Sequence, residues 1–203
     1  MIDASAPKFG LPVSLWIPIA AASVADVETF VCSILRREVD SKSGIVNAML
    51  VATGQMPPAN DPGVSLWTSK LGESAKERLY PARQVWVHVN YRDYRNTYIQ
   101  FGMPEIPPDY FLDHVQNRKA VRIRNYQHSY LRLCPVHRGV NTSGDHRAGG
   151  EGMEKEFLSN NPPASSANKI IYADPLDLTK MLDIPPGTQI LEGVRETQKL
   201  FYG

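Results

Sequence analysis

The sequence has few cysteines and almost no net charge. Its 203 residues include two cysteines, Cys32 and Cys134, and 22 Lys+Arg against 21 Asp+Glu, for a formal net charge of +1. Two cysteines cannot form a disulfide framework, and their apolar neighbours predict buried thiols in a reducing compartment, with one bridge between them as the alternative. With 42% hydrophobic residues, the composition excludes a disordered or collagen-like chain.

The sequence also lacks the short motifs that identify common catalytic sites. It contains no GxxxxGK[ST] phosphate loop, no HExxH motif and no GxSxG motif. An aromatic RNA-recognition signature and zinc-finger spacing are absent as well. Function must therefore be argued from the arrangement of charged and aromatic residues.

No apolar run is long enough to cross a membrane. Residues 11–25 form the most apolar stretch, which is shorter than the roughly 20 residues that span a bilayer. It resembles a signal-peptide core, but Pro12 and Pro18 interrupt it and Asp3 precedes it. We expect a buried strand here, with a retained signal-like segment as the alternative, and a cytoplasmic protein or an assembled particle with no membrane partner.

Proline, in contrast, is abundant. The chain has 16 prolines, half of them in four Pro-Pro pairs at 57–58, 107–108, 162–163 and 185–186. Proline cannot donate a backbone hydrogen bond and biases the preceding residue away from helix, so each pair predicts a break between elements.

Hydrophobic spacing predicts an α+β fold with a helical N-terminal half, followed by short strands and helices broken at Pro-Pro turns. Apolar residues from Val24 to Leu35 repeat at helical intervals and predict a helix from Ser23 to about Val39. Further helices are predicted at 44–53, 69–79, 109–117 and 177–182. Strands are predicted at 84–89, 96–101, 169–172 and 188–194. We expect one domain over 1–203, with a division into a mainly helical 1–80 and a mixed 81–203 as the alternative.

The near-zero net charge conceals a basic centre. Between Arg83 and Arg147 lie ten basic and five acidic residues, which gives +5 locally and leaves −4 for the rest of the chain. All five histidines fall in the same stretch. A neutral protein with a basic centre can bind a polyanion through one face.

Residues 121–133 carry the strongest functional pattern. As a strand, this segment places every cationic, aromatic or titratable side chain from Arg122 to Arg132 on one face, and as a helix it keeps a basic ridge at i, i+4 spacing. Arginine binds phosphates, and tyrosine and histidine rings stack on unpaired bases. The segment 91–95 repeats this interleaving. The predicted nucleic-acid contacts are Arg118, Arg122, Arg124, Tyr126, His128, Tyr130, Arg132, Arg138 and Arg147. The alternative is half-buried tyrosines with arginines paired to nearby acids.

These patterns favour a non-enzymatic protein that binds RNA or single-stranded DNA along the ridge and self-associates into a homo-oligomer. Large apolar residues near both chain ends, at 15–17 and 200–202, are typical of segments that dock on a neighbouring subunit, with packing on the chain's own core as the alternative. The corresponding role would be that of a coat or nucleocapsid protein.

The alternative is an enzyme that acts on an anionic substrate. Cys134, His137 and His146 offer a thiolate and two imidazoles, the ligands that zinc prefers, and Cys134 could instead be a nucleophile with a histidine base. The segment 139–152, with five glycines, would serve as a mobile lid. Zinc is the one cofactor that this alternative invokes.

Overall fold

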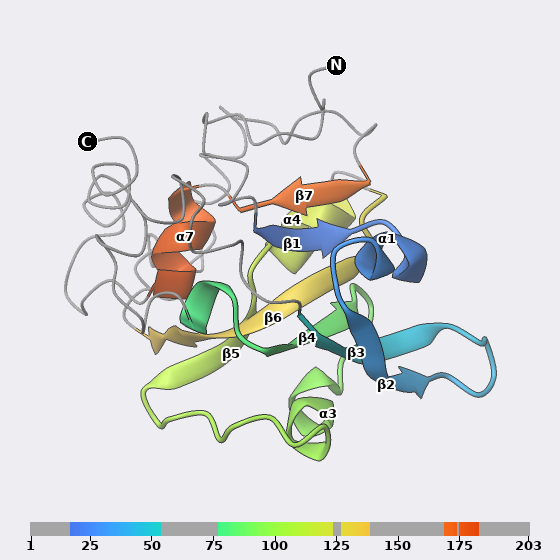
Figure 1. Ribbon diagram of the computed structural model, residues 1–203, viewed down its shortest axis with the longest axis horizontal. Coiled ribbons are helices and arrows are strands. Elements are labelled where there is room, and N and C mark those ends of the chain that lie inside the picture. Colours follow the sequence, from blue (N-terminus) through green and yellow to red (C-terminus); the bar gives the residue numbers. More distant parts are fainter. Residues whose placement is uncertain (1–16, 54–76, 124–126, 139–168, 174, 183–203) are drawn as a thin grey trace.

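The structure is a computed structural model that describes residues 17–53, 77–123, 127–138, 169–173 and 175–182. One antiparallel β-sheet dominates these residues and curls into a half-barrel (Figure 1). Its strands follow the order β2-β3-β4-β6-β1-β7, and β5 pairs with the C-terminal half of β6. The fold is mainly β. The predicted α+β class with a helical N-terminal half is therefore wrong.

Short elements make up the described chain. The strands are β1 (Pro18–Ala21), β2 (Ser33–Val39), β3 (Val46–Ala52), β4 (Arg83–His88), β5 (Tyr110–His114), β6 (Tyr130–His137) and β7 (Ile170–Tyr172). The helices are α1 (Val24–Glu28), α3 (Tyr94–Gln100), α4 (Arg118–Ile123) and α7 (Pro175–Leu182). Within the ranges described above, none of the helices has the length and apolarity needed to cross a membrane.

The predicted N-terminal helix ends after little more than one turn. Ser23 caps α1, where its side-chain oxygen accepts a hydrogen bond from the Asp26 backbone N–H at 3.2 Å. After Glu28 the chain bends into β2, yet Val27, Val31 and Ile34 still pack in one cluster. Helical spacing therefore identified residues of a common core. These residues lie on a helical turn and the strand that follows it, however, and not on one helix. The prediction of a helix to Val39 is wrong.

The predicted helix at 44–53 is strand β3. Residues 48–51 are buried consecutively because both faces of this strand are covered, which removes the alternation that marks a half-exposed strand. Gly44 lies in the turn between β2 and β3 with a φ of 71°, a backbone conformation that favours glycine. Its N–H donates to the Asp40 carbonyl at 2.8 Å and closes the turn.

Later elements are partly as predicted. The strands at 84–89 and 169–172 and the helical turn at 177–182 are confirmed by β4, β7 and α7, and β1 confirms a buried strand within 11–25. The segment 96–101 is helix α3 instead of a strand, and 109–117 contains strand β5 instead of a helix. Residues 69–76 and 188–194 lie outside the described residues.

The sheet has two covered faces, which we name after the helices on them. The α1 face carries side chains that meet α1 near one end and α7 near the other, among them Ala21, Met49, Trp86, Tyr130, Cys134 and Val136. The α3 face carries the alternate side chains, which meet α3 and α4, among them Leu50, Val87, Leu112, Leu131 and Leu133. β6 contributes to both faces because successive residues of a strand point to opposite sides.

Arg132 lies in the middle of the α1 face. It pairs across the sheet with Trp86 of β4, and only 1% of its surface is exposed. Its Nη2 donates to the carbonyl oxygens of Leu79 at 3.0 Å and Arg78 at 3.4 Å. Burial lowers the pKa of Arg132 to about 10, so the side chain remains charged at neutral pH.

Candidate nucleic-acid interface

Basic and aromatic side chains meet where α3, β5 and α4 come together on the α3 face. Tyr94 and Arg95 form the first turn of α3, His114 is the last residue of β5, and Arg118 begins α4. Tyr91 precedes α3 and completes the group. We call these five residues the α3–α4 cluster.

The α3–α4 cluster is held by one ring–ring contact, one cation–π contact and two hydrogen bonds. The Tyr94 and His114 rings meet edge to face with centroids 4.7 Å apart. The Arg95 guanidinium carbon lies 5.9 Å from the centre of the Tyr94 ring. Arg118 reaches the Tyr91 carbonyl at 3.5 Å, and the Tyr91 hydroxyl is held by a 2.6 Å hydrogen bond with Thr97. Aromatic rings and guanidinium groups thus alternate over this part of the surface.

The cluster is electropositive. Burial, assisted by repulsion from Arg118 and Arg95, lowers the pKa of His114 from 6.5 to about 4, so its ring is neutral at pH 7. Within the described part of the chain, Arg95 and Arg118 form no ion pair, and neither does the exposed Arg122 one turn further along α4. Among the described residues, no acid therefore neutralises these three guanidinium charges.

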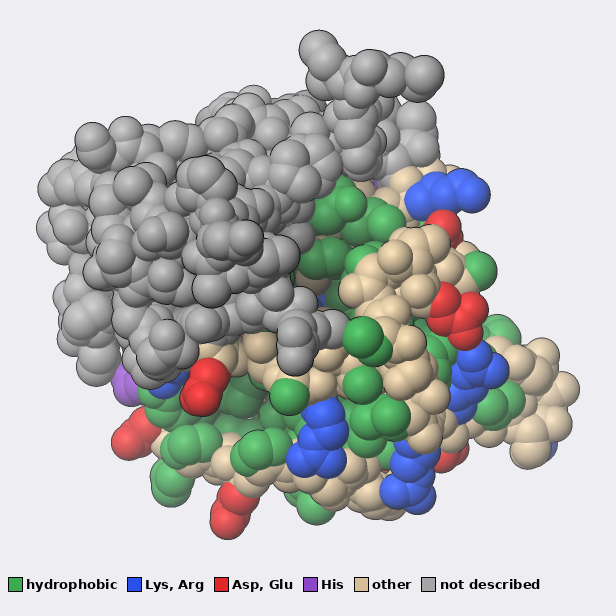
Figure 2. Space-filling view, viewed as in Figure 1, with side chains coloured by type: hydrophobic (Ala, Val, Ile, Leu, Met, Phe, Trp, Pro, Cys, Tyr) green, Lys and Arg blue, Asp and Glu red, His purple; other side chains and the backbone are tan. Residues whose placement is uncertain are grey.

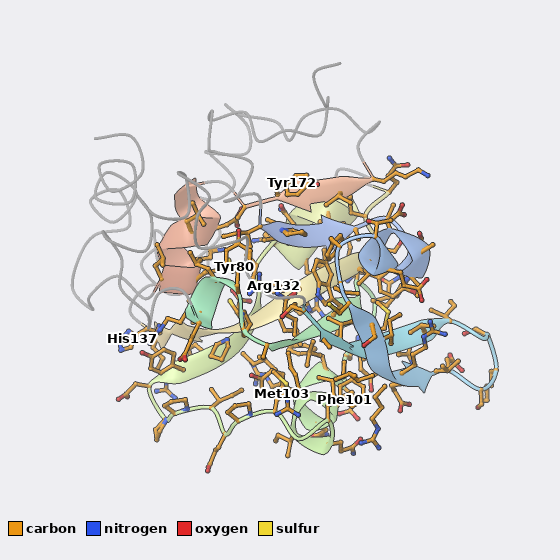
Figure 3. All side chains as sticks on the ribbon, viewed as in Figure 1. Tyr80, Phe101, Met103, Arg132, His137 and Tyr172 are labelled. Atoms are coloured by element: carbon orange, nitrogen blue, oxygen red, sulfur yellow. The ribbon has the colours of Figure 1, made fainter. Side chains whose placement is uncertain are left out.

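A second aromatic group lies at the opposite end of β5. Tyr110 pairs with His137 of β6 on the same face as His114, with ring centroids 5.3 Å apart and planes at 89°. The exposed Arg138 lies over the Phe111 ring at 4.9 Å, but Phe111 alternates with Tyr110 along β5 and points to the α1 face. Since Tyr110 and His114 are four strand positions apart, about 13 Å separates the two groups along the strand. Figure 3 places His137 at this end of the β5–β6 pair.

The structure divides the nine predicted nucleic-acid contacts into three sets. Arg118 is half-buried, and Arg122 and Arg138 are exposed. His128, Tyr130 and Arg132 are buried, at 3%, 7% and 1% exposure. The other three lie outside the described residues: Arg124, Tyr126 and Arg147.

Within the described residues, the predicted ridge is therefore not a continuous surface. The chain is helical at Arg122 and becomes a strand at Tyr130, so a single periodicity does not run through it. β6 is a central strand, and the side chains of Tyr130 and Arg132 point into the covered α1 face, where both are buried. This corrects their assignment as contact residues, and the same burial removes His128.

The predicted zinc ligands are not brought together. Cys134 and His137 are three positions apart on β6, so Cys134 faces the core of the α1 face while His137 faces Tyr110 on the other side. Burial raises the pKa of the Cys134 thiol to about 12, which disfavours the thiolate that a metal or a nucleophilic reaction requires. His146 lies outside the described residues, and within them no group of three metal-ligating side chains occurs.

Cys32 and Cys134 are both free thiols. Cys134 is buried as predicted, whereas Cys32 is exposed at the entrance to β2. The prediction of two buried thiols is therefore half wrong, because the apolar residues beside Cys32 turn inward and leave it outside.

Sequence reasoning missed His114 as a member of the site. It placed this histidine in a helix, but Tyr110, Leu112 and His114 alternate with residues of the other face and form a strand pattern. The interleaving at 91–95 was the signal that pointed to this surface. In Figure 2 the Lys and Arg side chains of the visible face lie apart from one another.

Comparison of the chain with family models, with curated proteins and with solved structures finds no match.

Proposed function

We propose that the protein binds single-stranded nucleic acid, RNA or DNA, through the α3 face, without catalysing a reaction. The observation that carries the proposal is the α3–α4 cluster, where an aromatic–histidine stack is flanked by arginines that form no ion pair within the described residues. Phosphates would contact Arg95, Arg118 and Arg122, and bases would stack on the half-exposed tyrosines.

The geometry favours a single strand over a duplex. Aromatic side chains stack on bases that have been freed from pairing, at about 1–3 kcal/mol for each base. Tyr94 and Tyr110 are half-buried, so part of each ring remains accessible. A strand that follows β5 on the α3 face would meet one aromatic group at each end, Tyr94 with Arg95 at one and Tyr110 with His137 at the other.

Salt dependence gives the first quantitative test. Three phosphate contacts predict that the logarithm of the binding constant falls with the logarithm of salt concentration with a slope of about −2 for a single strand. Binding of a fluorescently labelled oligo(U) and oligo(dT) is followed by anisotropy from low to physiological salt. Undetectable binding at low salt, or a slope near zero, would contradict the proposal.

Variants locate the interface. The triple variant Arg95→Ala, Arg118→Ala, Arg122→Ala is expected to lose at least tenfold in affinity and most of the salt slope. Arg37→Ala is the control, because Arg37 is also an exposed arginine but pairs with Glu28 at 2.8 Å on the α1 face. Equal affinities in the triple variant and the control would place any binding elsewhere.

We also propose that the protein self-associates in a coat or nucleocapsid-like role. Of the apolar residues near the chain ends, Ile17 is 1% exposed and packs in the chain's own core, so it is not a docking residue. The remaining end residues lie outside the described residues. Particle size in solution, measured together with the 260/280 nm absorbance ratio, tests assembly and bound nucleic acid at once. A monomer free of nucleic acid would refute the assembled particle.

A further inference from the structure

The buried arginine on the α1 face has unused donors. A guanidinium carries five N–H groups, and Arg132 directs its Nη2 at the Leu79 and Arg78 carbonyls. Among the described residues, Nε and Nη1 of Arg132 have no hydrogen-bond partner although both atoms are fully buried. Buried polar groups in folded proteins are nearly always paired, and a buried charge almost always is.

No acid among the described residues neutralises this arginine. None of their carboxylates lies within ion-pair distance of its guanidinium. The groups that act on its charge are the Cys134 thiol and the Tyr80 phenol, and burial favours the neutral form of both. Figure 3 shows Tyr80 and Arg132 close together beside β6. Among the described residues, the buried positive charge of Arg132 therefore has no acidic partner.

We propose that Arg132 binds a small monovalent anion within the α1 face. Nη2 belongs to both of the two-pronged edges of a guanidinium, so its use by the backbone leaves the Nε–H and the Nη1 hydrogens, which cannot hold one anion through a two-pronged edge. Such donors suit a compact anion such as chloride, or one oxygen of a carboxylate. A divalent oxyanion would leave a net negative charge buried beside Tyr80 and Cys134, which is unfavourable.

The wild-type protein provides the direct test. The Nε–H resonance of Arg132 in full-length protein labelled with ¹⁵N-arginine is recorded at constant ionic strength with chloride, acetate or sulfate as the anion. Its assignment comes from its loss in Arg132→Met. We expect a saturable shift with chloride or acetate and a much weaker one with sulfate; the two monovalent arms separate a halide site from a carboxylate site. A resonance that does not respond, or that responds equally to all three anions, would overturn the proposal.

Thermal unfolding gives an independent measurement. At concentrations above the dissociation constant, each tenfold rise in the concentration of the anion should raise the wild-type Tm by about 3–6 °C. Arg132→Met keeps the side-chain volume and removes the charge, so it should lose this increment while nucleic-acid binding on the α3 face is unchanged. Equal anion dependence in wild type and variant would refute the site, and if the variant does not fold, the resonance measurement decides alone.

Discussion

The buried imidazole of His114 should make stability depend on pH. Burial, together with Arg118 and Arg95, lowers its pKa from 6.5 to about 4 in the folded protein. Between these two values the unfolded chain binds a proton that the folded chain does not, so stability rises with pH. The contribution is complete above pH 6.5 and is lost as the pH falls toward 4. Linkage between the two pKa values gives a loss of about 2 kcal/mol between pH 7.5 and 5.0.

Urea unfolding at pH 7.5 and 5.0 measures this loss. His114→Gln removes the titrating group, and His137→Gln is the control because its ring makes a similar stacked contact at the other end of β5. Wild type and the control should lose about 2 kcal/mol more than His114→Gln between the two pH values. All titrating groups other than His114 are common to wild type and His114→Gln and cancel in that difference. The same pH dependence in His114→Gln and wild type would refute the reasoning.

Three further predictions concern thiols, a turn and the core. Under native conditions a thiol reagent should modify Cys32 and spare Cys134 until the protein unfolds, and rapid native modification of both would contradict the burial of Cys134. Gly44→Ala should cost about 1 kcal/mol in urea unfolding, because the φ of 71° is strained for alanine while the space around it is open. Trp86→Ala should destabilise the fold by about 3–5 kcal/mol, since this fully buried ring packs at the centre of the sheet, and a loss below 1 kcal/mol would show that the α1 face is not packed as described.

The sequence predicted core residues better than it predicted the elements that carry them. Val27, Val31 and Ile34 were assigned to one helix face, and they do share one cluster. Spacing alone could not show that the chain changes from a helical turn to a strand within those positions. In β3 the apolar run is buried on both faces, and such a run has no period that separates strand from helix.

The candidate site was predictable in kind but not in position. The segment 91–95 has the arginine–tyrosine interleaving that the structure places beside His114, and it was visible without coordinates. The contact between α3 and the end of β5 depends on tertiary packing across 20 residues of sequence. The burial of Arg132 also depends on tertiary structure, because an arginine in an alternating strand is normally expected to face water.

The two faces of the sheet use arginine in opposite ways, and this makes the two proposals separable. On the α3 face, the helices carry Arg95, Arg118 and Arg122. Water screens the charges of these arginines, and a strand of nucleic acid can displace that water. Arg132 lies on the α1 face, where water is excluded and an unneutralised charge bears directly on the stability of the fold. Substitutions in the first set should therefore change affinity and its salt slope with little effect on unfolding. Substitution of Arg132 should change the anion dependence of unfolding with little effect on affinity. If the triple variant lost stability while Arg132→Met lost nucleic-acid binding, both assignments of face would be wrong.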